Sequence, residues 1–130
     1  MSNNKKISFI LLFLILVAVL AYIFIFEGIN SKIEDEIQSG EPVVLLFSAS
    51  WCGSCTKLKP RLQAALKEKS HLNYHKIGDN LNKLRKKVLF EKYNVHGIPT
   101  LILFKDGKEY KRIVGVQTQE VLEDALSSLN

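Results

Sequence analysis

The stretch VVLLFSASWCGSC, residues 43–55, joins a compact apolar run to the only two cysteines of the chain. Pro42 precedes the run, and the unbroken apolar residues from Val43 to Phe47 indicate a buried strand. Cys52 and Cys55 follow almost at once. Apolar residues then recur at helical spacing, at Leu58, Leu62, Ala65 and Leu66. The stretch therefore predicts a buried strand that leads into a cysteine pair at the start of a helix.

Two cysteines placed in this way can exchange disulfides. If Cys52 begins the helix, unpaired backbone N–H groups and the positive end of the helix dipole favour its thiolate, which is the nucleophilic form. Cys55 lies about one helical turn later on the same face, so its thiol can attack a mixed disulfide formed at Cys52 and release the partner. The spacing predicts exchange in two steps.

The rest of the chain after residue 28 is predicted to contain both helices and strands. Asp106 and Gly107 stand between two apolar runs, which indicates a hairpin. On the helix predicted at 80–93, Leu81, Leu84 and Val88 share one face. The other predicted elements are helices at 29–38, 52–69 and 121–129 and strands at 72–77, 101–104 and 110–114. This order predicts an α/β sandwich with a mixed sheet.

Several motifs stand in the order found in thioredoxins. They are WCGSC at 51–55 after an apolar strand, Pro60, GIPT at 97–100, FKDGK at 104–108 and Gly115 before the last helix. Residues 40–130 therefore resemble the thioredoxin family, in which helices flank a mixed central sheet. The resemblance implies thiol–disulfide exchange through a redox-active cysteine pair, without a metal or an organic cofactor.

The resemblance also implies roles for individual residues. Cys52 is the attacking thiol and Cys55 the resolving thiol. Trp51 shields the site, and Gly53 and Ser54 tune it. The residues expected to bind an extended substrate polypeptide are Ile98, Pro99 and Thr100, with a cis bond before Pro99.

Three residues depart from the thioredoxin pattern. Ser54 replaces a proline before the second cysteine, and its additional backbone N–H and hydroxyl are expected to stabilise the Cys52 thiolate. Leu46 replaces a buried aspartate and cannot accept the proton of Cys55. Ser48 stands where thioredoxin has a second tryptophan. His75 and Glu41 are candidate proton acceptors in place of the aspartate.

The N-terminal stretch from Ile7 to Phe26 has Ser8 as its one clearly polar residue. At ~1.5 Å per residue, a helix of this length spans ~30 Å, the hydrocarbon thickness of a bilayer. A cleaved signal peptide is the alternative, although its apolar region usually has only ~7–15 residues. Lys5, Lys6 and the free amine precede the span, and Lys32 follows it among four acidic residues, so the tail is expected in the cytoplasm and the remainder outside.

The expected organisation has four parts. These are a cytoplasmic tail (1–6), a transmembrane anchor (7–26), a linker with a short amphipathic helix (27–39) and a thioredoxin-like domain (40–130). The net charge is +5, and without Lys5 and Lys6 it is 5 − 2 = +3, which suits solubility or a loose attraction to anionic lipid or wall polymer and requires neither. The basic residues near position 85 lack a recognition pattern for nucleic acid. The expected setting is the cell membrane of a bacterium, with exported thiol- or disulfide-containing proteins as substrates and a membrane redox partner that resets the cysteines.

Three alternatives remain open from the residues alone. Cys52 and Cys55 with His71 and His75 match the spacing of a Cys2His2 zinc site, although the cysteines would open a helix and the histidines would flank a strand. A structural disulfide is a second possibility, but so short a loop constrains the unfolded chain little. The third is an anchored, non-catalytic module that binds extended polypeptide at Ile98 and Pro99 without turnover.

Overall fold

A computed structural model of the chain describes residues 2–130, apart from the side chains of residues 26, 27 and 29–31. Three parts of the sequence-based expectations lie outside the described residues: Met1 of the tail, and the side chains of Phe26 in the span and Ile29 in the amphipathic helix. The chain divides into two compact units, Met1–Ile33 and Glu34–Asn130.

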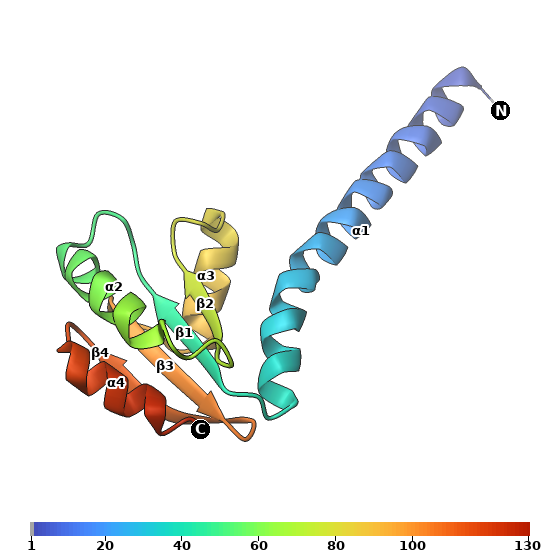
Figure 1. The fold of residues 1–130 in the computed structure, drawn as a ribbon. Helices are drawn as coiled ribbons and strands as arrows, with labels where there is room; N and C mark the ends of the chain where they lie inside the picture. The colour runs from blue at the N-terminus through green and yellow to red at the C-terminus, as the bar shows by residue number, and fades with distance from the viewer. Residues whose placement is uncertain (1) are drawn as a thin grey trace. The chain divides into compact units, whose positions relative to one another are not determined.

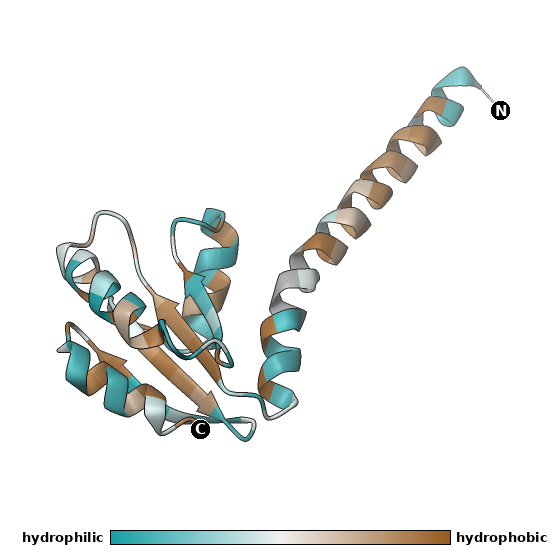
Figure 2. Cartoon of the chain, in the orientation of Figure 1, coloured by the Kyte–Doolittle hydropathy of each residue, from teal (hydrophilic) through white to brown (hydrophobic). Residues whose placement is uncertain are grey.

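Helix α1, Asn3–Gln38, runs without a break, so the expected span and the expected helix at 29–38 form a single helix. Gly28 remains helical, because one glycine costs a helix only about 1 kcal/mol. The stretch Asn3–Ile25 is long and apolar enough to cross a membrane, a property that signal sequences share. Figure 2 shows that most of this stretch is hydrophobic, and its large apolar side chains are exposed. A helix that is apolar on all sides and not covered by protein is typical of a segment in lipid.

The second unit contains a four-stranded mixed sheet in the order β2-β1-β3-β4. Strand β1 is parallel to β2 and antiparallel to β3, and β3 is antiparallel to β4. The strands are β1 (Val43–Phe47), β2 (Asn73–Ile77), β3 (Thr100–Lys105) and β4 (Lys108–Val114). The helices are α2 (Gly53–Leu66), α3 (Lys83–Lys92) and α4 (Gln119–Ser127). The predicted α/β sandwich with a mixed sheet is confirmed.

Helices cover both faces of this sheet (Figure 1). On one face, Val44 and Leu46 of β1 join a core cluster with Leu58 of α2 and Leu122 of α4. On the other face, Phe47 makes edge contacts with Phe90 of α3 and with Tyr93. Alternate residues of β1 thus serve opposite cores, and all five of its residues are buried.

The hairpin between β3 and β4 forms at the predicted place, with Asp106 at φ 54° and Gly107 at φ 77°. The predicted apolar face of α3 is wrong. The side chain of Asn82 caps the amide of Arg85, so α3 begins at Lys83 and leaves Leu81 outside. Leu84 is 48% exposed, whereas Leu89 is only 1% exposed. The helix is anchored through Leu89 and Phe90.

We expect Phe47→Ala to lower the free energy of unfolding by about 3–5 kcal/mol, because it empties a fully buried site between two aromatic rings. Urea unfolding of the full chain in a mild detergent, followed by circular dichroism, measures the loss. Val114→Ala removes an exposed side chain from the same sheet and should cost about 0.5 kcal/mol or less. Equal losses in the two variants would contradict this packing.

Candidate active site

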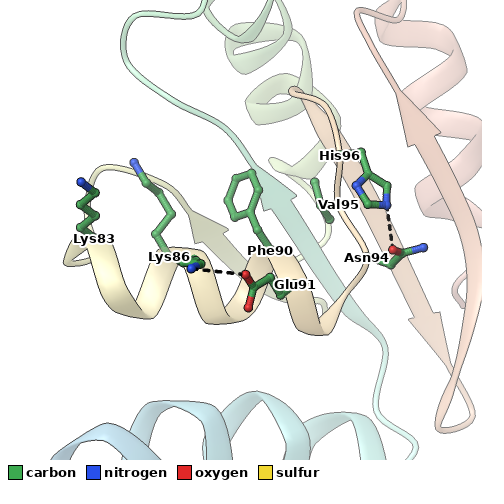
Figure 3. A pocket seen from close by; sticks show the side chains of 8 residues that line it. Lys83, Lys86, Phe90, Glu91, Asn94, Val95 and His96 are labelled. Atoms are coloured by element: carbon green, nitrogen blue, oxygen red, sulfur yellow. Dashed lines mark hydrogen bonds and ion pairs between the residues drawn. The ribbon is translucent and has the colours of Figure 1, made fainter.

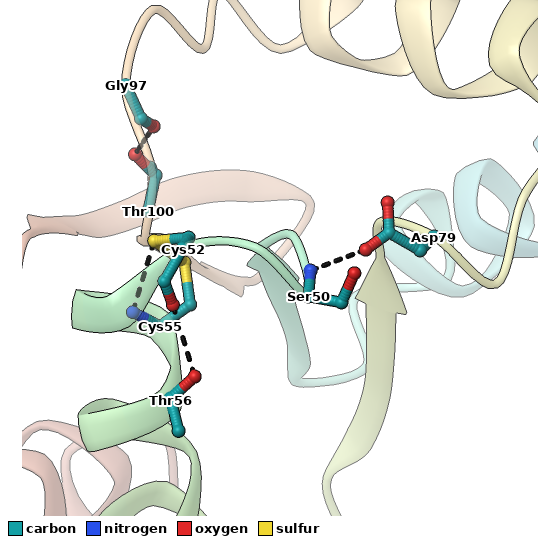
Figure 4. Close-up of a disulfide and its surroundings, with 7 residues drawn as sticks. All are labelled: Ser50, Cys52, Cys55, Thr56, Asp79, Gly97 and Thr100. Carbon is teal, nitrogen blue, oxygen red and sulfur yellow. Dashed lines mark hydrogen bonds between the residues drawn. A yellow bond between two sulfur atoms is a disulfide. The ribbon is translucent and has the colours of Figure 1, made fainter.

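The cysteine pair lies where β1 leaves the sheet and α2 begins. Cys52 is the N-cap of α2, with extended backbone at φ −87° and ψ 110°. Its sulfur accepts a hydrogen bond from the amide of Cys55 at 3.2 Å (Figure 4). The first amides of a helix have no partner within the helix, so this sulfur fills the place that a serine or aspartate oxygen usually takes.

Cys52 and Cys55 form a disulfide, with Cα atoms 5.2 Å apart. Both residues are buried and cluster with Ala49, and the half-buried Ile98 packs against them. Trp51, next to the pair, is 78% exposed. The pair is therefore covered on its inner side and bordered by two apolar side chains on its outer side.

The loop of residues 97–100 brings a distant part of the chain to the disulfide. The peptide bond between Ile98 and Pro99 is cis. Thr100 is buried, and its hydroxyl donates to the carbonyl of Gly97 at 2.7 Å (Figure 4). The carbonyl of Pro99 accepts from the amide of Gly115 at 2.9 Å. The Thr100 hydroxyl thus closes the loop on itself, while Ile98 reaches the cysteines.

Asp79 is a residue of the site that the sequence reasoning missed. It follows β2, and its carboxylate accepts the amide of Ser50 in the segment that leads to Trp51. Hydrogen bonds from Ser50, supported by Lys86, lower the pKa of Asp79 to about 2. The sequence could have indicated that Asp79 lies near the cysteines, because polar residues that follow adjacent parallel strands meet at one edge of a sheet.

The histidines do not join the cysteines. Within the described part of the chain, no three His, Cys, Asp or Glu side chains are grouped closely enough to hold a metal ion. His71 contacts Asn130 at 2.8 Å, and His75 contacts Glu36 at 2.5 Å. The geometry therefore does not support the zinc alternative. Glu41 accepts from Asn73 at 2.7 Å, so neither candidate proton acceptor is placed at Cys55.

A separate hollow of about 520 Å³ lies beside α3 (Figure 3). Phe90 and Val95 supply its apolar lining, with Lys83 at one end. Other charged side chains at its edge are engaged: Lys87 pairs with Glu91 at 3.8 Å, and His96 contacts Asn94 at 2.7 Å. No cysteine lines this hollow, so it is not where exchange takes place.

The chain matches the thioredoxin family model over residues 26–128. A thioredoxin of Chlamydia pneumoniae is 38% identical over 76% of this chain and 93% of its own length. A thioredoxin of Chlamydia trachomatis is 41% identical over 72% of this chain and 86% of its own length. The chain belongs to the thioredoxin family. It is accordingly a thiol–disulfide oxidoreductase with a Cys52–Cys55 disulfide pair.

Solved thioredoxin structures agree with this assignment. A mutant thioredoxin of Halobacterium salinarum superposes with a TM-score of 0.62 and 32% identity, over 76% of this chain and 83% of its own. Thioredoxin O2 of Arabidopsis thaliana in the oxidised state gives a TM-score of 0.68 and 26% identity, over 80% and 88%. In this member of the family, Leu46 is buried in the core next to α2 and carries no proton-accepting group.

We expect Asp79→Ala to speed amide exchange at Ser50 by about tenfold or more, the scale of one hydrogen bond to a charged acceptor. Hydrogen-exchange NMR at pH 5 measures this, with Asp124→Ala as a control on the exposed side of α4. Because folding lowers the pKa of Asp79 from 3.8 to about 2, the bond should hold above the ordinary pKa and be lost as the pH falls through about 2. Unchanged exchange in the variant would contradict a tether at Ser50.

Proposed function

We propose that this chain is a membrane-anchored thiol–disulfide oxidoreductase whose catalytic domain works outside the cytoplasmic membrane of a bacterium. The observation that carries the proposal is the exposed apolar helical stretch on the same chain as a thioredoxin domain. Residues 7–26 form the anchor, residues 27–39 the connection and residues 40–130 the exchange domain. Exported proteins with thiols or disulfides are its substrates.

The orientation follows from charge on the two sides of the anchor. Lys5 and Lys6 precede it, whereas one lysine, Lys32, follows it together with acidic residues: Glu27, Glu34, Asp35 and Glu36. Positive residues near a span favour the cytoplasmic side. The tail of residues 1–6 is therefore cytoplasmic and the domain extracytoplasmic, where disulfides form and persist.

In the proposed reaction, the Cys52 thiolate attacks a substrate disulfide, and one substrate sulfur leaves as a thiolate. Cys55 then attacks the Cys52 sulfur of the mixed disulfide, which releases the second substrate thiolate and forms the Cys52–Cys55 disulfide. The substrate gains two electrons and the cysteine pair loses them. Every step is reversible, so the same residues can oxidise a substrate dithiol. A membrane redox partner restores the starting state.

The substrate segment is proposed to lie along Trp51, Ile98 and Pro99. Trp51 is exposed and Ile98 contacts the cysteines, so both can bury apolar surface of an extended polypeptide. Pro99 has no N–H and cannot ligate a metal beside the sulfurs. Thr100 acts by closing the loop through its bond to Gly97, and Gly53 leaves open space at the start of α2.

The location of the domain can be tested with its own cysteines. Cys55→Ser leaves Cys52 as the single thiol, which a membrane-impermeant maleimide should label in intact cells after brief reduction. The same variant should accumulate mixed disulfides with exported proteins, released by dithiothreitol, because the resolving thiol is gone. The protein should remain in alkali-washed membranes.

The matched control carries Asn3→Cys in a chain without Cys52 and Cys55, and it should be labelled only after lysis. Labelling of Cys52 only after lysis would refute the orientation. Release of the protein from the membrane fraction would instead indicate a cleaved signal. The mixed disulfides separate an exchange enzyme from a passive binding module, which would form none.

Ser54 is proposed to make the pair more oxidising, because it supplies an additional backbone N–H at the start of α2. Ser54→Pro removes this N–H and should lower the reduction potential by roughly 20–30 mV, the equivalent of about one hydrogen bond. Equilibration of the full chain with glutathione buffers measures it, and Ser54→Ala separates the hydroxyl from the amide. An unchanged potential in Ser54→Pro would refute this role.

The reduction potential of the unmutated chain also indicates the direction of the reaction: a value of ~−270 mV suits a reductant and ~−120 mV an oxidant.

A further inference from the structure

A small cavity of about 260 Å³ lies behind the resolving cysteine. Its lining residues are Leu46, Ser48, Ala49, Ser50, Cys55, Thr56, Lys59 and Lys76. They come from β1 and the segment after it, from α2 and from β2. Two of them are lysines and, of these lining residues, none is acidic. We call this space the basic cavity.

Ser48 provides a buried hydroxyl to the basic cavity. The residue is only 4% exposed, and its Oγ has no hydrogen-bond partner among the described residues. Its backbone is held firmly, because its amide donates to the carbonyl of Ile77 at 3.0 Å. Gly78 packs so closely that a Cβ there would come 2.3 Å from the Ser48 carbonyl oxygen. Backbone contacts therefore hold Ser48 in place, although its hydroxyl makes no hydrogen bond to the described protein groups.

Lys59 and Lys76 line the same cavity as Cys55 and come from two different elements. Lys59 lies four residues after Cys55 on α2 and so shares its helix face. Lys76 pairs in register with Leu46 on the neighbouring strand. Among the described contacts, neither ammonium group has an ion pair or hydrogen bond. Asp79 reaches the rim through Ser50, but its carboxylate is shared between the Ser50 amide and Lys86.

We propose that the basic cavity stabilises the thiolate of Cys55, with Lys59, Lys76 and the Ser48 hydroxyl as positioning residues. When a thiolate attacks the sulfur of Cys52 in the disulfide, the S–S bond breaks and Cys55 leaves with the electron pair. In the opposite direction, Cys55 must lose its proton to water before it attacks. Nearby positive charge and a hydroxyl donor favour the charged sulfur in both directions. The inference rests on the resolving role proposed for Cys55.

The effect of the basic cavity on the Cys55 thiolate is opposite to the effect of a carboxylate at the same place. A negative group beside Cys55 would hold the proton on the sulfur and disfavour the thiolate. In this chain that place is the neutral Leu46, with a lysine as its partner across the sheet. A stabilised thiolate favours the reduced form of the pair, so the basic cavity makes the enzyme a better oxidant.

The test compares Lys59→Gln, Lys76→Gln, the double variant and Ser48→Ala, with Lys57→Gln as the control. Lys57 lies on α2 but does not line the basic cavity. In glutathione buffers, each lysine variant should make the pair harder to reduce by about threefold in the equilibrium constant, as expected for a partly exposed charge. The double variant should show the product of the two changes in the equilibrium constant. Lys76→Arg keeps the positive charge and should have the equilibrium constant of the unaltered chain.

A second measurement follows the thiolate absorbance of Cys55 against pH in a Cys52→Ser chain. The charged groups near this sulfur are Lys59 from α2, and Lys76 from β2 with Asp79 after it; the loop of residues 97–100 contributes none. The midpoint should rise in the double variant and in Ser48→Ala and stay unchanged in Lys57→Gln. No rise in these variants, or an equal rise in Lys57→Gln, would overturn the proposal. The accumulation of mixed disulfides in Cys55→Ser tests the resolving role of Cys55 separately. A failure of the proposed function can therefore be distinguished from a failure of the proposal for the basic cavity.

Discussion

The site depends on β1, a central strand that is paired on both edges and buried on both faces, as β3 is, and that leads directly to the cysteine pair. Its even-numbered residues, Val44 and Leu46, build the core shared with α2 and α4. Its odd-numbered residues include Phe47, which holds α3 through the ring of Phe90. If a strand in this position shifted by one residue, each of its side chains would move to the opposite face of the sheet, and both cores would lose their packing. The point at which the chain leaves the sheet is thereby determined, and the cysteine pair begins five residues later.

The start of α2 shows how one interaction serves both structure and chemistry. The amide of Cys55 lies in the first turn, where no helical carbonyl is available to accept it, and the sulfur of Cys52 takes that place. The same amide is a donor that favours negative charge on that sulfur. Two further segments complete the site: the loop closed by Thr100 brings Ile98 to the cysteines, and Asp79 holds the approach at Ser50. The site is therefore made from three parts of the chain that only the fold brings together.

The sequence allowed the sheet and the cysteine pair to be predicted, because both depend on local patterns. Val43–Phe47 is an unbroken apolar run, and its observed limits match the prediction at both ends. The face of α3 was mispredicted because this basic helix has few apolar residues, and the choice between Leu84 and Leu89 depends on where Asn82 caps it. The contact of Asp79 with Ser50 spans 29 residues; the position of Asp79 after a strand indicates the edge of the sheet where it lies, but not that it accepts the Ser50 amide. The same holds for the hydroxyl of Ser48, whose isolation depends on the close approach of Gly78.

Two of the three departures from the thioredoxin pattern, Leu46 and Ser48, lie on one side of the disulfide, whereas Ser54 lies between the two cysteines in the sequence. Trp51 and Ile98, which border the disulfide, are among the residues that the family resemblance implies. Leu46 and Ser48, which depart from it, line the basic cavity behind Cys55. A small residue at 48 leaves room for water, and a neutral residue at 46 leaves Lys76 without a carboxylate across the sheet. Trp51 and Ile98 do not line this cavity, and under the proposal for the basic cavity the changes at Leu46 and Ser48 alter the energy of the Cys55 thiolate. On this proposal, residues behind the cysteines shift the reduction potential of the pair while the proposed polypeptide-binding surface stays the same.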